Sequence, residues 1–166
     1  SIGESFNNMM TLLQNKQIEL EESNKKLNIL VDIDALTQIG NRRSFQSSID
    51  KIHLLSLRYN HPYSIIICDV DNFKLYNDTY GHQKGDYVLI SVANAMKAAI
   101  RKTDEVFRWG GEEFIVILPV QSHEDALKVG ENLRSSVHAL GIEHSKSGFN
   151  VVTMSLGVAS FYPANT

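Results

Sequence analysis

The chain has 166 residues, of which 43% are hydrophobic and 21% charged, and its formal net charge is −3. This composition is typical of a globular protein with one domain and room for an appended segment. Without a basic excess, nothing indicates a surface for a nucleic acid polymer, although a small anionic ligand needs only a local cluster of cations. No apolar run approaches the roughly 20 residues of a membrane span. We therefore expect no membrane segment in this sequence and a cytoplasmic location, which leaves room for a membrane-anchored parent protein.

Residues 1–33 carry an apolar seam with alternating intervals of four and three residues, the heptad pattern of a coiled coil. The seam consists of Phe6, Met10, Leu13, Gln17, Leu20, Asn24, Leu27 and Val31. Gln17 and Asn24 occupy positions where a polar residue costs stability but fixes register and oligomer state. The pattern favours a parallel dimeric coiled coil, and the alternative is one amphipathic helix packed on its own domain.

The next stretch of the chain predicts a helix followed by a buried strand. Asn41 is a plausible N-cap, and His61-Pro62 ends the helix that it starts. One face of this helix carries Phe45, Ile49, Ile52 and Tyr59. YSIIICDV (63–70) is short, β-branched and apolar on both faces, which predicts a central strand. The only cysteine, Cys68, lies within it and is expected to be a buried, unreactive thiol.

The second half of the domain predicts alternating helices and strands. The polar stretch 71–86 should hold a short helix, and residues 86–100 a longer one. VFRW (106–109) and EFIVILP (113–119) flank Gly-Gly, which is a hairpin signal. Residues 151–160 form a further predicted strand. A third amphipathic helix in 123–140 would bury Ala126, Val129, Leu133, Val137 and Leu140. The hairpin adds antiparallel pairing, so the expected class is α+β, a mixed sheet flanked by helices.

Two pairs of acidic residues lie at predicted strand ends: Asp69 with Asp71, and Glu112 with Glu113. Neighbours on a strand point to opposite faces, so one acid of each pair can face a common site. Converging carboxylates repel each other unless a cation lies between them. Mg²⁺ commonly takes one or two carboxylates together with water and substrate phosphate. Gly110 and the glycine after it permit a tight turn and leave room for a ligand. Each acid alone could equally be a solvated turn carboxylate.

Four further polar residues follow the first acidic pair: Lys74, Asn77, His82 and Asp86. Lys74 offers a point charge for a phosphate group. A carboxylate such as Asp86 can accept from N1–H and the exocyclic amine of guanine, and Asn77 can add contacts to the base edge. These residues therefore suggest a site for Mg²⁺ and a nucleotide phosphate, with guanine as the favoured base.

Several motifs occur along the chain in a fixed order. DALTQIGNRRSF (34–45) resembles DxLTGLxNRRxF, and DVDNFKLYNDTYGHQKGDYVL (69–89) resembles DxDxFKxxNDxxGHxxGDxxL. GGEEF (110–114) and VVTMSLGVA (151–159) follow. Together they resemble the GGDEF family of diguanylate cyclase domains, in its common glutamate variant. The resemblance implies a fold like the palm of nucleotidyl cyclases and polymerases. It also implies the condensation of two GTP into cyclic di-GMP, with release of two pyrophosphates.

The resemblance assigns roles position by position. It implies a metal site for Mg²⁺, with Mn²⁺ as an alternative, formed by Asp69, the carbonyl of Val70 and Glu112. It implies Glu113 as the general base for the ribose 3′-hydroxyl. The implied substrate contacts are the backbone amides of Asn72 and Phe73, the ammonium of Lys74, His82, and Asn77 with Asp86 on the guanine.

The resemblance also covers regulation and assembly. Arg101 and Asp104 match an RxxD motif that marks an inhibitory product site, where Arg101 would grip cyclic di-GMP and Asp104 would accept guanine donors. As a bare pattern, the two residues could equally be a surface ion pair. Since each subunit holds one GTP, two sites must face each other in a homodimer. The coiled coil at 1–33 would bring the two together and carry a signal from an upstream sensor domain.

The sequence departs from the family pattern at its end. No AKxxGRN-like stretch follows the late strand, so residues 34–166 are expected to be a GGDEF domain shortened at its C-terminus, with weak turnover or none. The alternative function is a catalytically inactive receptor of GTP or cyclic di-GMP that signals through the coiled coil. A third possibility is a dimerisation fragment with an idle nucleotide site. The intact GGEEF signature favours an active cyclase.

Overall fold

The computed structural model describes residues 1–164, without the side chains of residues 29 and 30. The chain divides into two compact units, Ser1–Ile33 and Asp34–Thr166. Each unit is described by itself. None of the helices in the described part of the chain is long and apolar enough to cross a membrane.

The first unit consists of one long helix, α1 (Ile2–Asp32), which confirms the helix expected in this region. Ser1 caps it, since its side chain accepts from the Glu4 amide. The apolar seam is open to solvent in the single chain: the exposed fractions of Phe6, Leu13 and Leu20 are 56%, 57% and 58%. An exposed apolar stripe along a helix is typical of a surface that packs against another element. The coiled coil itself stays a prediction.

The second unit is built on a four-stranded antiparallel sheet. Its strands are β1 (Tyr63–Val70), β2 (Glu105–Gly110), β3 (Glu113–Pro119) and β4 (Met154–Phe161), in the order β2-β3-β1-β4. The α+β class, the hairpin and the interior position of β1 are confirmed. The mixed character is limited to an isolated parallel bridge between Gly40 and Phe107. β1 is not buried on both faces throughout, because Ile67 is 56% exposed.

Four helices complete this unit: α2 (Arg42–Tyr59), α3 (Phe73–Tyr80), α4 (His82–Ala99) and α5 (His123–His138). Asn41 is confirmed as the N-cap of α2, since its side chain accepts from the Ser44 amide at 3.0 Å. The predicted face of α2 included Tyr59, but this residue lies at the end of the helix and is 60% exposed.

Two helix boundaries differ from the prediction. α4 begins at His82 rather than at residue 86, because Gly81, with φ 91°, reverses the chain directly after α3. No side-chain cap bond marks this start. α5 ends at His138, so Leu140 lies beyond the helix and is 38% exposed. The positive φ of 61° at Gly141 turns the chain away there.

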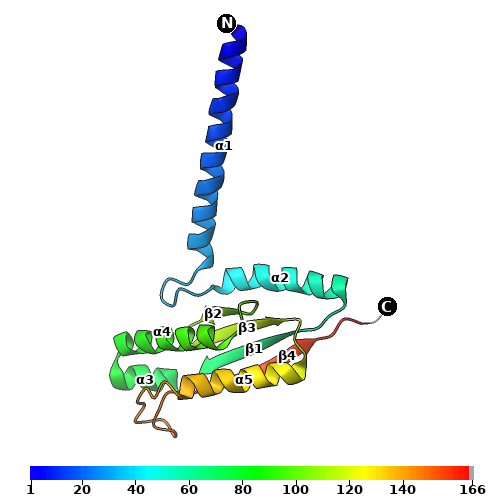
Figure 1. The fold of residues 1–166 in the computed structure, drawn as a ribbon. Helices are drawn as coiled ribbons and strands as arrows, with labels where there is room; N and C mark the ends of the chain where they lie inside the picture. The colour runs from blue at the N-terminus through cyan, green and yellow to red at the C-terminus, as the bar shows by residue number, and fades with distance from the viewer. Residues whose placement is uncertain (165–166) are drawn as a thin grey trace. The chain divides into compact units, whose positions relative to one another are not determined.

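The helices cover the two faces of the sheet (Figure 1). Ile66 and Cys68 of β1 belong to a core shared with α4 and α5, whereas Tyr63 packs in a second core with Phe45 of α2. Cys68 is fully buried, and this burial raises the pKa of its thiol to about 12. Almost no thiolate is therefore available at neutral pH, as expected for an unreactive cysteine.

The antiparallel pairing brings three sequence-distant segments to one end of the sheet. Asp69, near the end of β1, lies opposite Glu113 at the start of β3 and opposite Ser155 near the start of β4. The turn of the β2–β3 hairpin therefore lies beside the segment that leaves β1. This end of the sheet carries the acidic pairs of the sequence.

Candidate active site

The sheet brings Asp69 and the turn that carries Glu112 and Glu113 to the same end. Register places Asp69 directly opposite Glu113, and the Val70 amide donates to the Glu112 carbonyl at 3.2 Å. Gly111, whose φ is 38°, occupies the turn in the left-handed region that favours glycine. The hairpin thus delivers both glutamates to the end of β1. Glu113 is exposed, and Asp69 and Glu112 are half-buried.

The negative charges of the acidic residues repel one another. Burial raises the pKa of the Asp69 carboxyl above its usual range, and the negative charges of Glu112, Glu113 and Asp71 raise it further. A divalent cation between the carboxylates would remove this repulsion.

The donor set fits a cation that takes few protein ligands. In the described part of the chain, no three His, Cys, Asp or Glu side chains are grouped tightly enough to form a metal site alone. Two carboxylates with a backbone carbonyl suit Mg²⁺, which keeps several waters and binds substrate phosphate. The Asp69 carboxylate, the Val70 carbonyl and the Glu112 carboxylate are the residues that could hold it.

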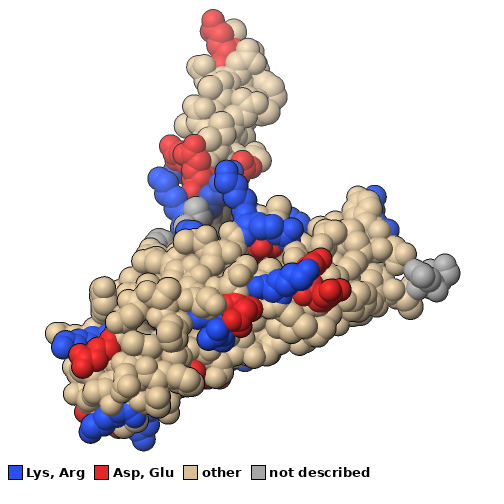
Figure 2. Space-filling model, turned by 60° about the horizontal axis from the view of Figure 1, so that its bottom comes forward, with Lys and Arg blue, Asp and Glu red and all other residues tan. Residues whose placement is uncertain are grey.

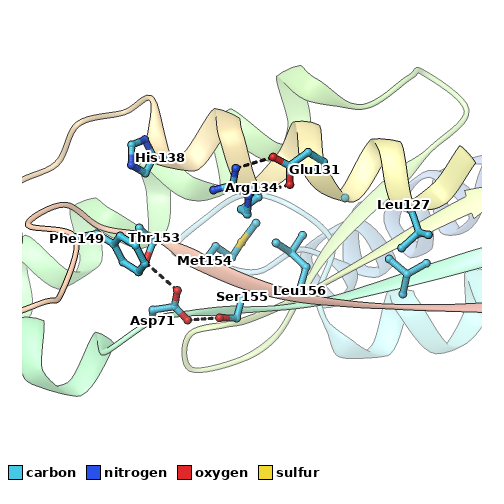
Figure 3. A pocket seen from close by; sticks show the side chains of 12 residues that line it. Asp71, Leu127, Glu131, Arg134, His138, Phe149, Thr153, Met154, Ser155 and Leu156 are labelled. Atoms are coloured by element: carbon cyan, nitrogen blue, oxygen red, sulfur yellow. Dashed lines mark hydrogen bonds and ion pairs between the residues drawn. The ribbon is translucent and has the colours of Figure 1, made fainter. Parts of the chain in front are cut away.

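The turn after β1 is fastened to β4 through Asp71. Its carboxylate accepts from Thr153 Oγ1 at 2.8 Å and from Ser155 Oγ at 2.5 Å, and its amide donates to the Thr153 carbonyl at 2.9 Å (Figure 3). Asp71 therefore serves the turn and β4. The sequence offered no direct sign of these two hydroxyl partners, which lie 82 and 84 residues further along the chain.

Arg108 is a structural residue of the site that the sequence interpretation missed. Its Nε and Nη2 donate to the Gly111 carbonyl at 3.0 and 2.9 Å, which braces the glycine turn. Its Nη1 contacts the Asp34 carboxylate at 3.2 Å. Asp34 also accepts from the amide and hydroxyl of Thr37. Although burial favours the neutral acid, the hydrogen bonds from Thr37 and Arg108 together hold the pKa of Asp34 below its usual range.

Arg108→Met is expected to lower the free energy of unfolding by about 1–3 kcal/mol, because it breaks charge-assisted hydrogen bonds to both Asp34 and the hairpin turn. Denaturant unfolding would measure the loss. Arg134→Met is the matched control, since the side chain of Arg134 is 47% exposed and forms an ion pair with Glu131 of the same helix; its loss should change stability by less than about 1 kcal/mol. Equal losses in the two variants would contradict this role for Arg108.

The predicted nucleotide contacts lie on α3 and α4. Lys74, His82 and Asp86 are exposed, and Asn77 is half-buried. Asn77 Oδ1 is buried and has no hydrogen-bond partner among the described residues. A Cβ built on Gly85 would come within 1.8 Å of this oxygen. Glycine at this position in α4 therefore makes room for the Asn77 side chain.

Arg101 and Asp104 form a closed pair rather than two open ligand groups. The guanidinium donates to both carboxylate oxygens, at 3.2 and 3.1 Å, and also contacts the Gln121 side chain. The side chain of Asp104 is 1% exposed, whereas that of Arg101 is 55% exposed. The hydrogen bond with Asp104 raises the pKa of Arg101. In this arrangement Asp104 holds Arg101 in place, and the role of the pair as a product site stays a prediction.

A cavity of about 500 Å³ lies between α5 and β4. Asp71, Arg134, Phe149 and Thr153 are among its lining residues (Figure 3), but Asp69, Glu112 and Glu113 are not. The cavity therefore reaches the acidic end of the sheet only through Asp71 and the start of β4. On the face shown in Figure 2, basic and acidic side chains lie in small groups of both signs divided by uncharged surface. That face has no continuous basic field of the kind that binds a nucleic acid polymer.

Comparison with known proteins identifies the family. Residues 31–166 match the model of the family described as "Diguanylate cyclase, GGDEF domain". Over 126 residues the chain is 42% identical to the diguanylate cyclase DgcM of Escherichia coli K12; the alignment covers 76% of this chain and 30% of DgcM. The chain thus spans about a third of the length of this relative.

Solved structures agree with the family match. The active GGEEF domain of a diguanylate cyclase from Vibrio cholerae is 33% identical, with a TM-score of 0.66, covering 78% of this chain and 81% of that one. The coiled coil and GGDEF domain of DgcB from Caulobacter crescentus, in complex with c-di-GMP, has a TM-score of 0.81 and covers 96% and 84%. Its identity is 24%, so it supports the fold alone.

The chain belongs to the GGDEF family of diguanylate cyclase domains. The expected fold is confirmed by these neighbours. Members of this family that are diguanylate cyclases use divalent metal ions, which agrees with the carboxylate donors at the end of β1.

Proposed function

We propose that this chain is the catalytic part of a diguanylate cyclase, which condenses two GTP into cyclic di-GMP and releases two pyrophosphates. The observation that carries the proposal is the meeting of Asp69, Glu112 and Glu113 at one end of the sheet, next to an intact glycine turn. The repulsion among these acids calls for a divalent cation, and their surroundings offer groups for a nucleotide.

The roles follow from position. Asp69, the Val70 carbonyl and Glu112 would hold Mg²⁺, or Mn²⁺ in its place. The cation neutralises charge on the phosphates and lowers the pKa of the attacking hydroxyl when bound. Glu113 is exposed on the same side as Asp69, where its carboxylate could take the proton of the ribose 3′-hydroxyl.

The substrate is proposed to be GTP. The amides of Asn72 and Phe73 and the ammonium of Lys74 would bind the phosphates, with His82 contributing to the same contacts. Asp86 would accept the paired N–H donors of guanine, and the side-chain amide of Asn77 would add contacts to the base edge. Adenine offers no such pair of donors, which favours guanine.

One assay tests the proposal. The full-length protein would be incubated with GTP and Mg²⁺, and the products would be separated and identified. Cyclic di-GMP and pyrophosphate in a one-to-two ratio are expected. Binding of cyclic di-GMP without any turnover would instead establish the inactive receptor. If the protein shows no binding and no turnover, the interpretation as a dimerisation fragment with an idle nucleotide site would be established.

The proposed cyclase works as a homodimer, in which α1 of each subunit forms the coiled coil and an upstream sensor domain acts through it. The proposal places this chain in the cytoplasm, whether or not the parent protein is anchored in a membrane. The support is the open apolar seam of α1. Two half-sites on separate subunits gain a high effective concentration when they are linked in this way.

Leu20→Pro is expected to lower cyclase activity at least tenfold at low protein concentration, because proline breaks a helix interior and with it the seam. Sedimentation should show the matching loss of dimer. Activity that recovers as the protein concentration is raised would confirm that the lesion lies in association. An unaffected rate at dilute protein would contradict the role of the seam.

Arg101→Ala is expected to relieve inhibition by cyclic di-GMP, raising the inhibitory concentration at least about tenfold, because the exposed guanidinium is the proposed grip on the product. The initial rate without product should stay close to that of the wild-type protein. Asp104→Asn tests the structural arrangement, since Arg101 would then lose its buried anchor. Unchanged inhibition in Arg101→Ala would exclude this product site.

A further inference from the structure

His144 is a fully buried histidine in the segment between α5 and β4. Its ring lies edge-on to the rings of Tyr76 and Tyr80 of α3, at centroid distances of 5.3 and 6.3 Å. His144 therefore packs against the helix that follows the turn after β1. His144 is not among the residues proposed to bind the metal or the nucleotide.

The polar contact of His144 is with the turn itself. Its Nε2 lies 3.1 Å from the carbonyl oxygen of Asn72. Because a carbonyl oxygen can only accept, Nε2 must carry the hydrogen and donate it. Nδ1 is buried without a partner. The ring thus presents its one N–H to Asn72.

Backbone and side-chain contacts hold the ring in this position. The His144 amide donates to the Asn150 carbonyl at 2.9 Å, and the Ser147 amide donates to the His144 carbonyl at 3.1 Å. On the α3 side, the Ser145 amide donates to Tyr80 Oη at 2.9 Å, and that hydroxyl donates to Ser145 Oγ. His144 is therefore placed by its own loop and by α3 together.

The turn has an unusual backbone conformation. Asn72 is left-handed, with φ 52° and ψ 35°, a region that asparagine tolerates better than most residues other than glycine. It is the N-cap of α3 but makes no side-chain cap bond. Its carbonyl receives the Tyr76 amide at 3.0 Å and His144 Nε2, so both lone pairs are used.

Peptide geometry connects this carbonyl to the phosphate contacts. The Asn72 carbonyl and the Phe73 N–H belong to the same planar trans peptide, so they point in opposite directions. Fixing the carbonyl toward His144 therefore fixes the Phe73 N–H toward the side where the phosphates are proposed to bind. The side chain of the preceding residue, Asp71, is anchored by the hydroxyls of Thr153 and Ser155 (Figure 3).

We infer that His144 is a positioning residue for the phosphate-binding turn: its Nε2–H holds the Asn72 carbonyl and thereby aims the Phe73 amide at the nucleotide phosphate. The inference rests on the proposed function, because it assumes that the turn binds a nucleoside triphosphate. His144 lies 72 positions beyond Asn72 and would not itself touch the substrate, so it acts through the turn.

Two substitutions isolate this hydrogen bond. His144→Phe keeps an aromatic ring against Tyr76 and Tyr80 but removes the donor. His144→Gln places an amide donor near the position of Nε2. The KM for GTP is expected to rise about tenfold in His144→Phe, with a smaller change in kcat, since a small misplacement of a binding group weakens its contact. In His144→Gln, the KM should return to within about threefold of the wild-type value.

A matched control removes the effect of stability. Val137→Ala empties part of the core under α5 without removing a hydrogen-bond donor, and should destabilise the protein while leaving the KM for GTP unchanged. A raised KM in the control equal to that of His144→Phe would overturn the inference. So would an unchanged KM in His144→Phe.

A measurement without substrate separates this inference from the proposed reaction. Long-range ¹H–¹⁵N NMR spectra should show the Nε2–H tautomer of His144, and the Phe73 amide signal should shift in His144→Phe but not in Val137→Ala. If the wild-type protein makes no cyclic di-GMP, the proposed function fails, and these spectra decide the inference alone. An Nδ1–H tautomer or an unmoved Phe73 signal would overturn it.

Discussion

Glu113→Gln is expected to lower the conversion of GTP to cyclic di-GMP at least about 100-fold, the scale on which removal of a general base acts. Glutamine keeps the size of the side chain and its place opposite Asp69, so the hairpin should fold unchanged. Stabilisation of the protein by Mg²⁺ should persist, because the proposed metal ligands are intact. Steady-state rates and thermal unfolding with and without Mg²⁺ would measure the two effects.

Glu112→Gln provides the comparison that distinguishes the two neighbouring glutamates. It should lose both turnover and the stabilisation by Mg²⁺, since Glu112 is the proposed ligand. The charges of both glutamates raise the pKa of Asp69, so the two variants are needed to decide which of them shares the cation with it. If Glu113→Gln loses the Mg²⁺ effect while Glu112→Gln keeps it, the assigned roles are exchanged. Glu124→Gln, at the exposed start of α5, is the control and should change neither property.

The sequence predicted those features whose cause is local. The capping side chain of Asn41 and the apolar run 63–70 each carry their own signal, and both elements form as expected. The glycine pair before Glu112 also carries a local signal, and it predicted the hairpin. Gly111 takes a backbone conformation that few other residues tolerate. The site follows from these elements, since the hairpin and β1 are neighbours in the sheet.

The contacts that hold the site in shape could not be predicted, because they join segments far apart in the sequence. Arg108 reaches Asp34 across 74 residues, and His144 reaches Asn72 across 72. An arginine before a glycine turn and a histidine in a polar loop have many uses, and only the fold selects one. The sheet shows the same limit: periodicity identifies strands but does not state which edges pair, so the antiparallel order emerged only in the structure.

Asp69→Asn is expected to have opposite effects on stability with and without the cation. Burial and the charges of Glu112, Glu113 and Asp71 raise the pKa of Asp69 in the folded protein. A raised carboxyl pKa contributes stability below the unfolded value and loses it as pH rises through the folded value. At neutral pH and without metal, the charged Asp69 therefore destabilises the wild-type protein, and the neutral asparagine should raise its melting temperature.

Adding Mg²⁺ should reverse the order. Saturating metal is expected to stabilise the wild-type protein by about 1–3 kcal/mol through preferential binding to the folded state, and Asp69→Asn by much less. Turnover in the variant should fall at least about 100-fold, since one of its few metal ligands is gone. Thermal unfolding with a chelator and with Mg²⁺, repeated at lower pH, would measure these shifts.

The higher stability of the metal-free variant should shrink as the pH falls and Asp69 of the wild-type protein takes up its proton. Asp50→Asn, an exposed acid on α2, should follow the wild-type protein throughout. A variant that is less stable than the wild-type protein without metal would show that Asp69 is held by favourable contacts rather than by mutual repulsion, and the argument for a cation at this end of the sheet would lose its physical basis.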